Sequence, residues 1–161
     1  MSDPTSVAPF RWSLLRRDTG LVVVNDLRIA DGYWSRLAGL QFRATLPVGR
    51  GMLLVKSASV HTFWMRFPID IAFIGSDGRV LGIRRGARPW RVAAGPRGTH
   101  AVLETKAGWL QLEPGARLAA VCASDQDLLR RRRSMSFLGP VAAGGQRVEF
   151  SERVGPEPQN A

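Results

Sequence analysis

The chain contains very little cysteine and lysine and no long apolar segment. Cys122 is the only cysteine among 161 residues, so an intramolecular disulfide and a thiolate metal site are both excluded. No segment approaches the roughly 20 apolar residues that a membrane helix needs. The first ten residues hold an aspartate and two prolines instead of the apolar run of a signal peptide. We therefore expect a soluble, cytoplasmic protein with no membrane span.

Lysine is nearly absent although the protein is strongly basic. Lys56 and Lys106 are the only lysines among 23 basic residues, and the net charge is +10. An arginine-rich composition explains this charge without any binding role, and apart from Arg130–Arg133 the arginines are spread along the chain. Because no nucleic-acid-binding motif is recognisable, we do not expect nucleic acid as the main partner. Electrostatic binding of nucleic acid or an acidic surface through the arginines remains an alternative.

Sequence motifs for the common kinds of catalysis are also missing. The chain has no His-Glu-x-x-His metal motif, no Gly-x-Ser-x-Gly nucleophile turn and no phosphate-binding glycine loop. Cys122 lies in an apolar segment and is typical of a core residue. We therefore expect no metal, no cofactor and no nucleophile, and the sequence does not favour an enzyme.

Short apolar segments separated by turn residues predict strands. Hydrophobic residues make up 45% of the chain, which is enough for a core. Residues 69–74 alternate, with Ile69, Ile71 and Phe73 on one face and Asp70, Ala72 and Ile74 on the other. The expected strands are 10–16, 21–24, 51–56, 61–65, 69–74, 79–83, 101–105 and 116–122. Short helices are expected at 31–40 and 125–133, and a long loop at 84–99. The sequence thus predicts an all-β domain, a compact sandwich or barrel with one or two short helices.

The same pattern predicts the domain organisation. Residues 1–9 are polar and proline-bearing, which is typical of a flexible N-terminal arm. Residues 10–124 form a single β-rich domain. Residues 125–161 begin with the basic helix and continue as a partly disordered tail, in which residues 147–150 are a candidate edge strand.

Several blocks, in a fixed order from about Val22 to Val121, resemble one known family. They are Arg36–Leu40, Gly51–Leu54, His61–Ile74, Asp77–Val80, Arg88–Arg91 and Val102–Gly108. Together they resemble the bacterial and archaeal family called domain of unknown function 192. The resemblance implies a compact β-sandwich-like fold and no reaction, because the family has no established activity. Leu54 replaces the usual Phe, and Ala116 follows Gly115 where an acid is common, which removes a carboxylate from that turn.

Four polar side chains are embedded in apolar segments: His61, Arg66, Asp70 and Glu104. A buried carboxylate without a partner is costly, so both acids should be paired or face a wet cleft. Arg66 lies four positions before Asp70 and offers a guanidinium fork to either carboxylate. We expect these four residues, with Trp64, to line one pocket for a polar or anionic molecule. The alternative is an internal salt-bridge network that only stabilises the fold.

Trp90 lies between two arginines, Arg88 and Arg91. This pattern favours a stacking surface with cationic rims, or alternatively a tryptophan that closes an open end of the sheet. The candidate ligand-binding residues are His61, Trp64, Arg66, Asp70, Arg88, Trp90 and Glu104. The leading hypothesis is a non-catalytic binding module for a polar or anionic ligand or a protein partner. The enzymatic alternative is an acid–base or hydrolase-like site built from His61, Asp70 and Glu104.

Overall fold

The computed structural model describes residues 12–30, 45–122, 133–138 and 142–143, and nearly all of them belong to strands or tight turns. The strands form three sheets, with the orders β11-β10-β1-β2, β3-β4-β9-β6-β7 and β5-β8. Their bounds are β1 Trp12–Arg16, β2 Val22–Val24, β3 Asp26–Ala30, β4 Arg50–Val55, β5 Ser59–His61, β6 Ile69–Gly75, β7 Val80–Ala87, β8 Val92–Ala94, β9 Thr99–Lys106, β10 Leu118–Cys122 and β11 Ala142–Ala143. A single 3-10 turn, η1, covers Ser136–Leu138.

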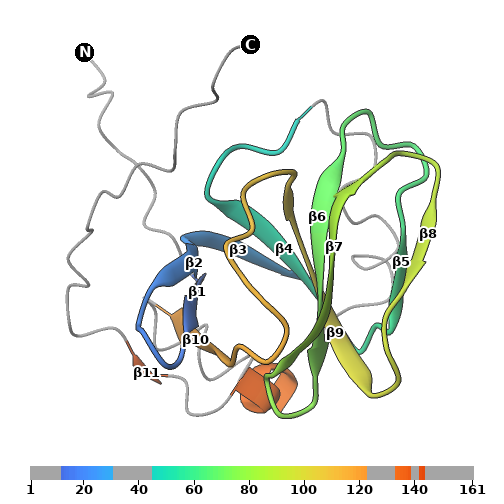
Figure 1. The fold of residues 1–161 in the computed structure, drawn as a ribbon. Coiled ribbons are helices and arrows are strands. Elements are labelled where there is room, and N and C mark those ends of the chain that lie inside the picture. Colours follow the sequence, from blue (N-terminus) through green and yellow to red (C-terminus); the bar gives the residue numbers. More distant parts are fainter. Residues whose placement is uncertain (1–11, 31–44, 123–132, 139–141, 144–161) are drawn as a thin grey trace, which may run out of the picture.

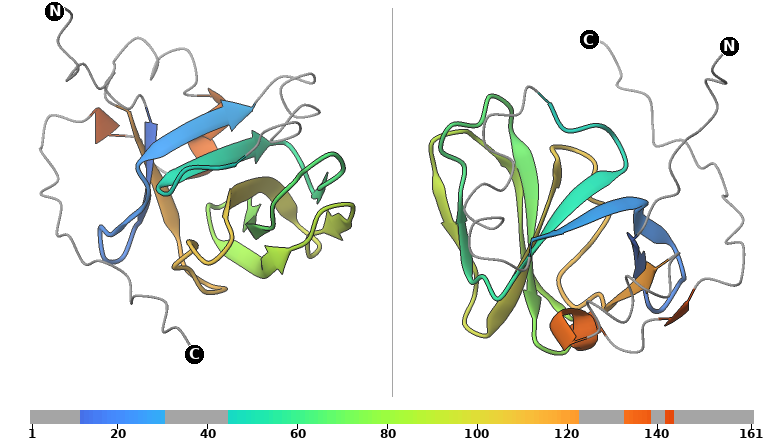
Figure 2. Two further views of the ribbon diagram at one scale, coloured as in Figure 1. Left: turned by 90° about the horizontal axis from the view of Figure 1, so that it is seen from above. Right: turned by 180° about the vertical axis from the view of Figure 1, so that it is seen from behind.

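The five-stranded sheet lies in the middle of the fold. Figure 1 shows β1 and β10 on one side of it and β5 and β8 on the other, and the view from behind in Figure 2 repeats this separation. Every residue of β6 is buried, because both faces of the central sheet are covered. The all-β, sandwich-like prediction is therefore confirmed.

The alternation of β6 divides the core in two. Ala72 and Ile74 belong to the cluster shared with β1 and β10. Ile69, Ile71 and Phe73 belong to a second cluster, which includes Val60 of β5 and Ala93 of β8. We call these the first core and the second core. The alternation that the sequence predicts for this strand is thus the one observed.

The expected strands at 10–16 and 21–24 contain β1 and β2, which form a hairpin. β1 pairs with β2, and Gly20 in the connecting turn has a φ of +70°, a backbone conformation that glycine adopts at little cost. On its other edge β1 pairs antiparallel with β10 over its whole length, from Trp12 opposite Cys122 to Arg16 opposite Leu118. Cys122 is buried, as expected for a core residue.

Three local predictions differ from the structure. The expected loop at 84–99 is wrong in part, because β7 continues to Ala87 and residues 92–94 form β8. β7 is an edge strand, and edge strands tolerate charged side chains that point outward. Its arginines therefore resemble those of a loop when only the sequence is considered. The expected strand 61–65 is wrong beyond His61, where β5 ends and a turn begins. β3 was not expected at all.

Some predictions fall outside the described residues. These are the arm 1–9, the helix 31–40, the candidate edge strand 147–150 and all but Arg133 of the helix 125–133. The domain boundaries therefore remain predictions. In the part of the chain that the structure describes, no helix is long and apolar enough to cross a membrane.

Candidate functional site

Asp70 is completely buried in β6, and its carboxylate is paired with backbone amides. Oδ1 accepts a hydrogen bond from the N–H of Gly86 at 2.8 Å. Oδ2 accepts from the N–H groups of Gly108 at 2.9 Å and Leu110 at 3.3 Å. Arg66 is exposed and forms no salt bridge with any described residue. The sequence prediction that Arg66 satisfies this carboxylate is therefore wrong, since three N–H donors do so.

Arg85 completes the attachment of the same segment. Its guanidinium donates to the carbonyl oxygens of Leu110 at 2.6 Å and Leu112 at 2.8 Å. Asp70 thus holds N–H groups and Arg85 holds C=O groups of one irregular stretch that runs from Gly108 to Leu112. Irregular backbone needs such partners when it is buried, so these two charged side chains replace the hydrogen bonds of a sheet.

Asp70 and Glu104 lie on opposite faces of the central sheet. In the pairing of β6 with β9, Asp70 lies opposite Thr105, whereas Glu104 lies opposite Ile71. Adjacent positions of a strand point to opposite faces. Glu104 therefore points toward the second core, where its cross-strand neighbours Met52 and Ile71 are buried. The structure does not bring the two acids into the single pocket that the sequence suggested.

Glu104 is buried without a full set of hydrogen bonds. The residue is 3% exposed, and its Oε2 has no hydrogen-bond partner among the residues that the structure describes. Burial raises the pKa of this carboxyl from 4.5 to about 8, because an apolar environment penalises the charged form. A pKa of about 8 favours the protonated form of this carboxyl at pH 7.

The remaining candidates gather at two turns that Thr62 joins. Its hydroxyl donates to the carbonyl of Arg88 at 2.7 Å and accepts from the N–H of Arg91 at 2.9 Å. Its backbone also contacts the other turn: the N–H of Thr62 donates to the carbonyl of Arg91, and the carbonyl of Thr62 accepts from the N–H of Trp90. The turn after β5 is thus fixed against the turn before β8. Sequence reasoning missed Thr62, because a lone threonine carries no signal of this role.

The two turns present a row of aromatic rings. Trp64 and Trp90 are 54% and 52% exposed, and their rings meet edge to face with centroids 4.8 Å apart. Phe63 lies 5.9 Å from Trp90, and His61 stacks on Phe63 at 5.1 Å. We call these four residues the aromatic platform. It unites three of the predicted site residues, His61, Trp64 and Trp90.

Both tryptophans have a left-handed backbone. Their φ angles are +65° for Trp64 and +61° for Trp90. This conformation costs a non-glycine residue about 1 kcal/mol or more. Strain of this kind is concentrated at functional sites.

Only positive charge surrounds the platform in the sequence. Residues 57–69 and 78–103 contain no aspartate or glutamate, although Asp70 and Glu104 directly follow them and are buried. Arg66, Arg88 and Arg91 are exposed. The guanidinium of Arg91 donates to the carbonyl of Trp90 at 3.1 Å, which keeps it at the platform.

The described residues contain no group of three or more His, Cys, Asp or Glu side chains that would hold a metal ion. The platform presents flat aromatic rings beside exposed arginines, which are groups suited to stacking and to donating hydrogen bonds.

Comparison with known proteins identifies a family and several relatives that resemble this chain. The family model DUF192, described as "Uncharacterized ACR", matches residues 15–120. A protein of Thermococcus sibiricus named "UPF0127 protein" is 30% identical over 99 residues, which is 59% of this chain and 64% of that protein. The match thus spans less than two thirds of this relative.

Two crystal structures resemble the fold. One, from Sinorhizobium meliloti, is described as a putative transcription regulator; it has a TM-score of 0.59 and 26% identity, covering 68% of this chain and 92% of that one. The other, a protein of unknown function from Novosphingobium aromaticivorans, has a TM-score of 0.56 and 28% identity, covering 67% and 82%.

Proposed function

The chain belongs to the DUF192 family, and we propose that its described domain is a non-catalytic binding module for an anionic ligand with a flat face. The ligand stacks on Trp64 and Trp90, and its negative charge lies against the exposed arginines of the two turns. The observation that carries this proposal is the pair of half-exposed, left-handed tryptophans held edge to face at 4.8 Å.

Rigidity supports the proposal, because a preformed surface loses little entropy on binding. Thr62 fixes the relative position of the two turns through its hydroxyl and its backbone. Trp90 does not close the end of a sheet, since half of it is exposed.

Charge supports the anionic class of ligand. Arg88 and Arg91 flank Trp90 in sequence, and Arg66 follows Trp64 by two residues. The two stretches that build the platform contain no carboxylate. A cationic ligand would meet only like charge there, whereas an anion gains charge-assisted hydrogen bonds.

The acid–base alternative is less well supported. Its three residues are His61, Asp70 and Glu104, but Asp70 is buried and committed to three backbone N–H groups. Glu104 points into the second core, on the opposite face of the sheet from Asp70. A general acid or base must reach its substrate, and neither carboxyl is accessible.

Two anions of equal charge test the proposal by calorimetric titration. The first, 2-naphthoate, has a flat aromatic face, and the second, cyclohexanecarboxylate, has none. We expect saturable binding of 2-naphthoate and at least tenfold weaker binding of cyclohexanecarboxylate. Equal affinities, or no binding of either compound, would overturn the proposal.

Variants of the platform provide the matched comparison. Trp64→Asn and Trp90→Asn remove each ring but keep a residue that tolerates a left-handed backbone, and each should weaken 2-naphthoate binding at least tenfold. Trp109→Asn is the control, because Trp109 is 37% exposed and lies outside the platform. An equal loss in the control would contradict the assignment.

Oligonucleotides should be titrated into the protein in the same calorimetric experiment, because the similar Sinorhizobium protein is described as a putative transcription regulator. Binding of a single-stranded oligonucleotide that falls steeply with salt and is lost in Trp64→Asn would favour a nucleic-acid ligand at this platform.

A further inference from the structure

Three arginines form one row at the ends of neighbouring strands: Arg17 follows β1, Arg117 precedes β10 and Arg79 precedes β7. The β1–β10 register, continued by one residue, sets Arg17 opposite Arg117, and the Arg17 N–H donates to the Arg117 carbonyl at 2.8 Å. Arg117 forms an antiparallel bridge with Arg79 on its other side. Paired residues of antiparallel strands point to the same face.

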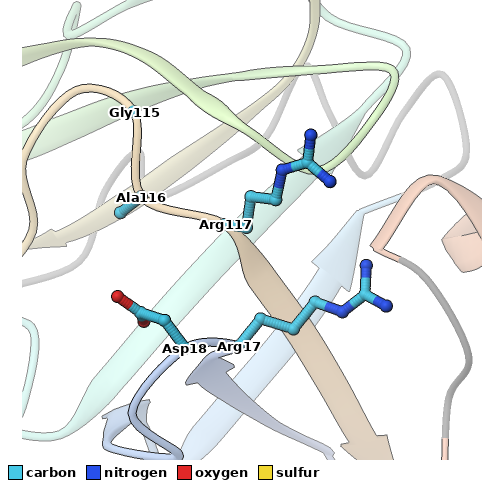
Figure 3. Close-up of a pocket in the computed structure, with 5 residues that line it drawn as sticks. All are labelled: Arg17, Asp18, Gly115, Ala116 and Arg117. Carbon is cyan, nitrogen blue, oxygen red and sulfur yellow. The ribbon is translucent and has the colours of Figure 1, made fainter.

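A hollow lies at this row. It has a volume of about 430 Å³ and is lined by Arg17, Asp18, Gly115, Ala116 and Arg117. Figure 3 shows the side chains of Arg17 and Arg117 extending in the same direction from neighbouring strands, while Asp18 points away from them. Two of the side chains that line the hollow thus carry guanidinium groups on the same side, away from the Asp18 carboxylate.

The nearby carboxylates are paired with other arginines. Arg16 binds Asp18 at 2.6 Å and Glu113 at 2.7 Å. Arg79 lies 3.6 Å from Asp77. Neither Arg17 nor Arg117 forms a salt bridge with any described residue, and both are exposed. The backbone N–H of Arg79 and, to a smaller extent, the charge of Arg117 lower the pKa of Asp77, but neither Arg17 nor Arg117 has a carboxylate within salt-bridge distance among the described residues.

Like charges directly opposite one another on neighbouring strands destabilise a sheet. The pair of Arg17 and Arg117 has this arrangement, with Arg79 as a third positive charge in the row. The side chains of Arg17 and Arg117 form no hydrogen bond within the described residues, and only Asp77, which also pairs with Arg79, offsets the charge of Arg117. An anion between the two guanidiniums would remove the repulsion and use their fork geometry.

We propose that this hollow is an anion-binding site for a dianion of the phosphate-monoester type, held between the guanidinium groups of Arg17 and Arg117. Two positive charges match a dianion in number, and two planar forks match its several oxygen atoms in geometry. The site is separate from the aromatic platform, so either one can fail without the other.

Inorganic phosphate is the probe, titrated into the full-length 15N-labelled protein at pH 7.5 and followed by amide and arginine Nε resonances. Chloride at the same ionic strength is the reference. We expect saturable shifts at residues 17, 18 and 115–117 with phosphate and none with chloride. The double variant Arg17→Gln, Arg117→Gln should bind at least tenfold more weakly. Absence of saturation, or unchanged binding by the variant, would overturn the site.

Three comparisons sharpen this result. The double variant Arg84→Gln, Arg97→Gln removes the same charge from two other exposed arginines and should bind phosphate like the wild type; an equal loss there would mean nonspecific attraction. Trp64→Asn should also bind phosphate normally, which separates this site from the platform. Dimethyl phosphate, a monoanion, should bind at least fivefold more weakly, and equal binding would contradict the dianion assignment.

Repulsion between the arginines provides an independent test. At low ionic strength without phosphate, Arg117→Gln should melt at a higher temperature than the wild type, because a like-charge pair is gone. Saturating phosphate should stabilise only the wild type and cancel that difference. A lower melting temperature of Arg117→Gln without phosphate would mean that Arg117 stabilises the fold, and the argument from repulsion would fail.

Discussion

Asp70 and Glu104 lie on adjacent strands, one position out of register with each other, and therefore point to opposite faces of the same sheet. Asp70 receives three backbone N–H groups. Glu104 has a carboxyl oxygen with no partner among apolar neighbours. Two buried acids of one sheet thus have contrasting roles, and substitutions should separate them.

Asp70→Asn should destabilise the protein by roughly 2–4 kcal/mol. The amide keeps the shape of the carboxylate but loses its charge, and its NH₂ group would face a backbone N–H donor. The free energy of unfolding in urea measures the loss. Asp26→Asn is the control, since its salt bridge with Arg50 is partly exposed and should contribute about 1 kcal/mol or less. An equal decrease in the free energy of unfolding for Asp70→Asn and Asp26→Asn would contradict the role given to Asp70.

Arg85→Met should release the stretch from Gly108 to Leu112. The variant loses two hydrogen bonds to carbonyl oxygens, at a cost of about 1–3 kcal/mol. Hydrogen exchange should accelerate at the amides of Gly108 and Leu110, which Asp70 holds. Arg84→Met, one residue earlier and exposed, should leave both measurements unchanged. Unaltered exchange in Arg85→Met would show that Asp70 alone holds the stretch.

Stability should fall as the pH rises through the neutral range, because of Glu104. Burial raises its pKa to about 8 from 4.5, so between these values the folded protein retains a proton that the unfolded chain has released. Because the unfolded state binds fewer protons, the free energy of unfolding decreases as the pH rises, by up to about 1.4 kcal/mol for each pH unit. Urea unfolding at pH 5, 6, 7 and 8 measures this slope.

Glu104→Gln is the partner experiment, because glutamine does not titrate. The variant should show a flatter profile than the wild type from pH 5 to pH 8, so its relative stability should improve with pH. Parallel profiles for the two proteins would mean that Glu104 does not retain its proton on folding.

Thr62→Val should loosen the aromatic platform. Valine has the shape of threonine but no hydroxyl, so the carbonyl of Arg88 and the N–H of Arg91 lose their partner, at a cost of about 1–3 kcal/mol. Nuclear Overhauser effects between the indoles of Trp64 and Trp90 should weaken. Thr99→Val is the control, because that hydroxyl forms an exposed bond to Pro96. Intact indole contacts in Thr62→Val would contradict the role of Thr62.

Sequence patterns predict the interior of this fold better than its edges. β6 alternates between two apolar faces, and that period is decided by local residue order. β3 and β8 are short and carry polar or small residues, so they depend on partners far away in the chain. β7 continues through Arg84 and Arg85 because it is an edge strand, which a single sequence does not reveal.

The candidate site divides in the same way. The sequence predicts Trp90 from its flanking arginines and Trp64 from its place beside His61 and Arg66, and the structure brings the two rings together. Asp70 was assigned to a pocket because a buried acid needs partners, and its partners proved to be backbone amides of Gly86, Gly108 and Leu110. Every residue except proline has a backbone N–H, so no pattern of residue types in the sequence indicates which of them will bind Asp70.

The pairing of β1 with β10 has a consequence for biosynthesis. A chain emerging from the ribosome presents Trp12–Arg16 early, but one edge of this strand stays open until Leu118–Cys122 follows. During that interval its unpaired backbone and apolar side chains can join other growing chains. Completion of the first core is therefore a late event, and messages truncated before codon 118 should yield aggregating products.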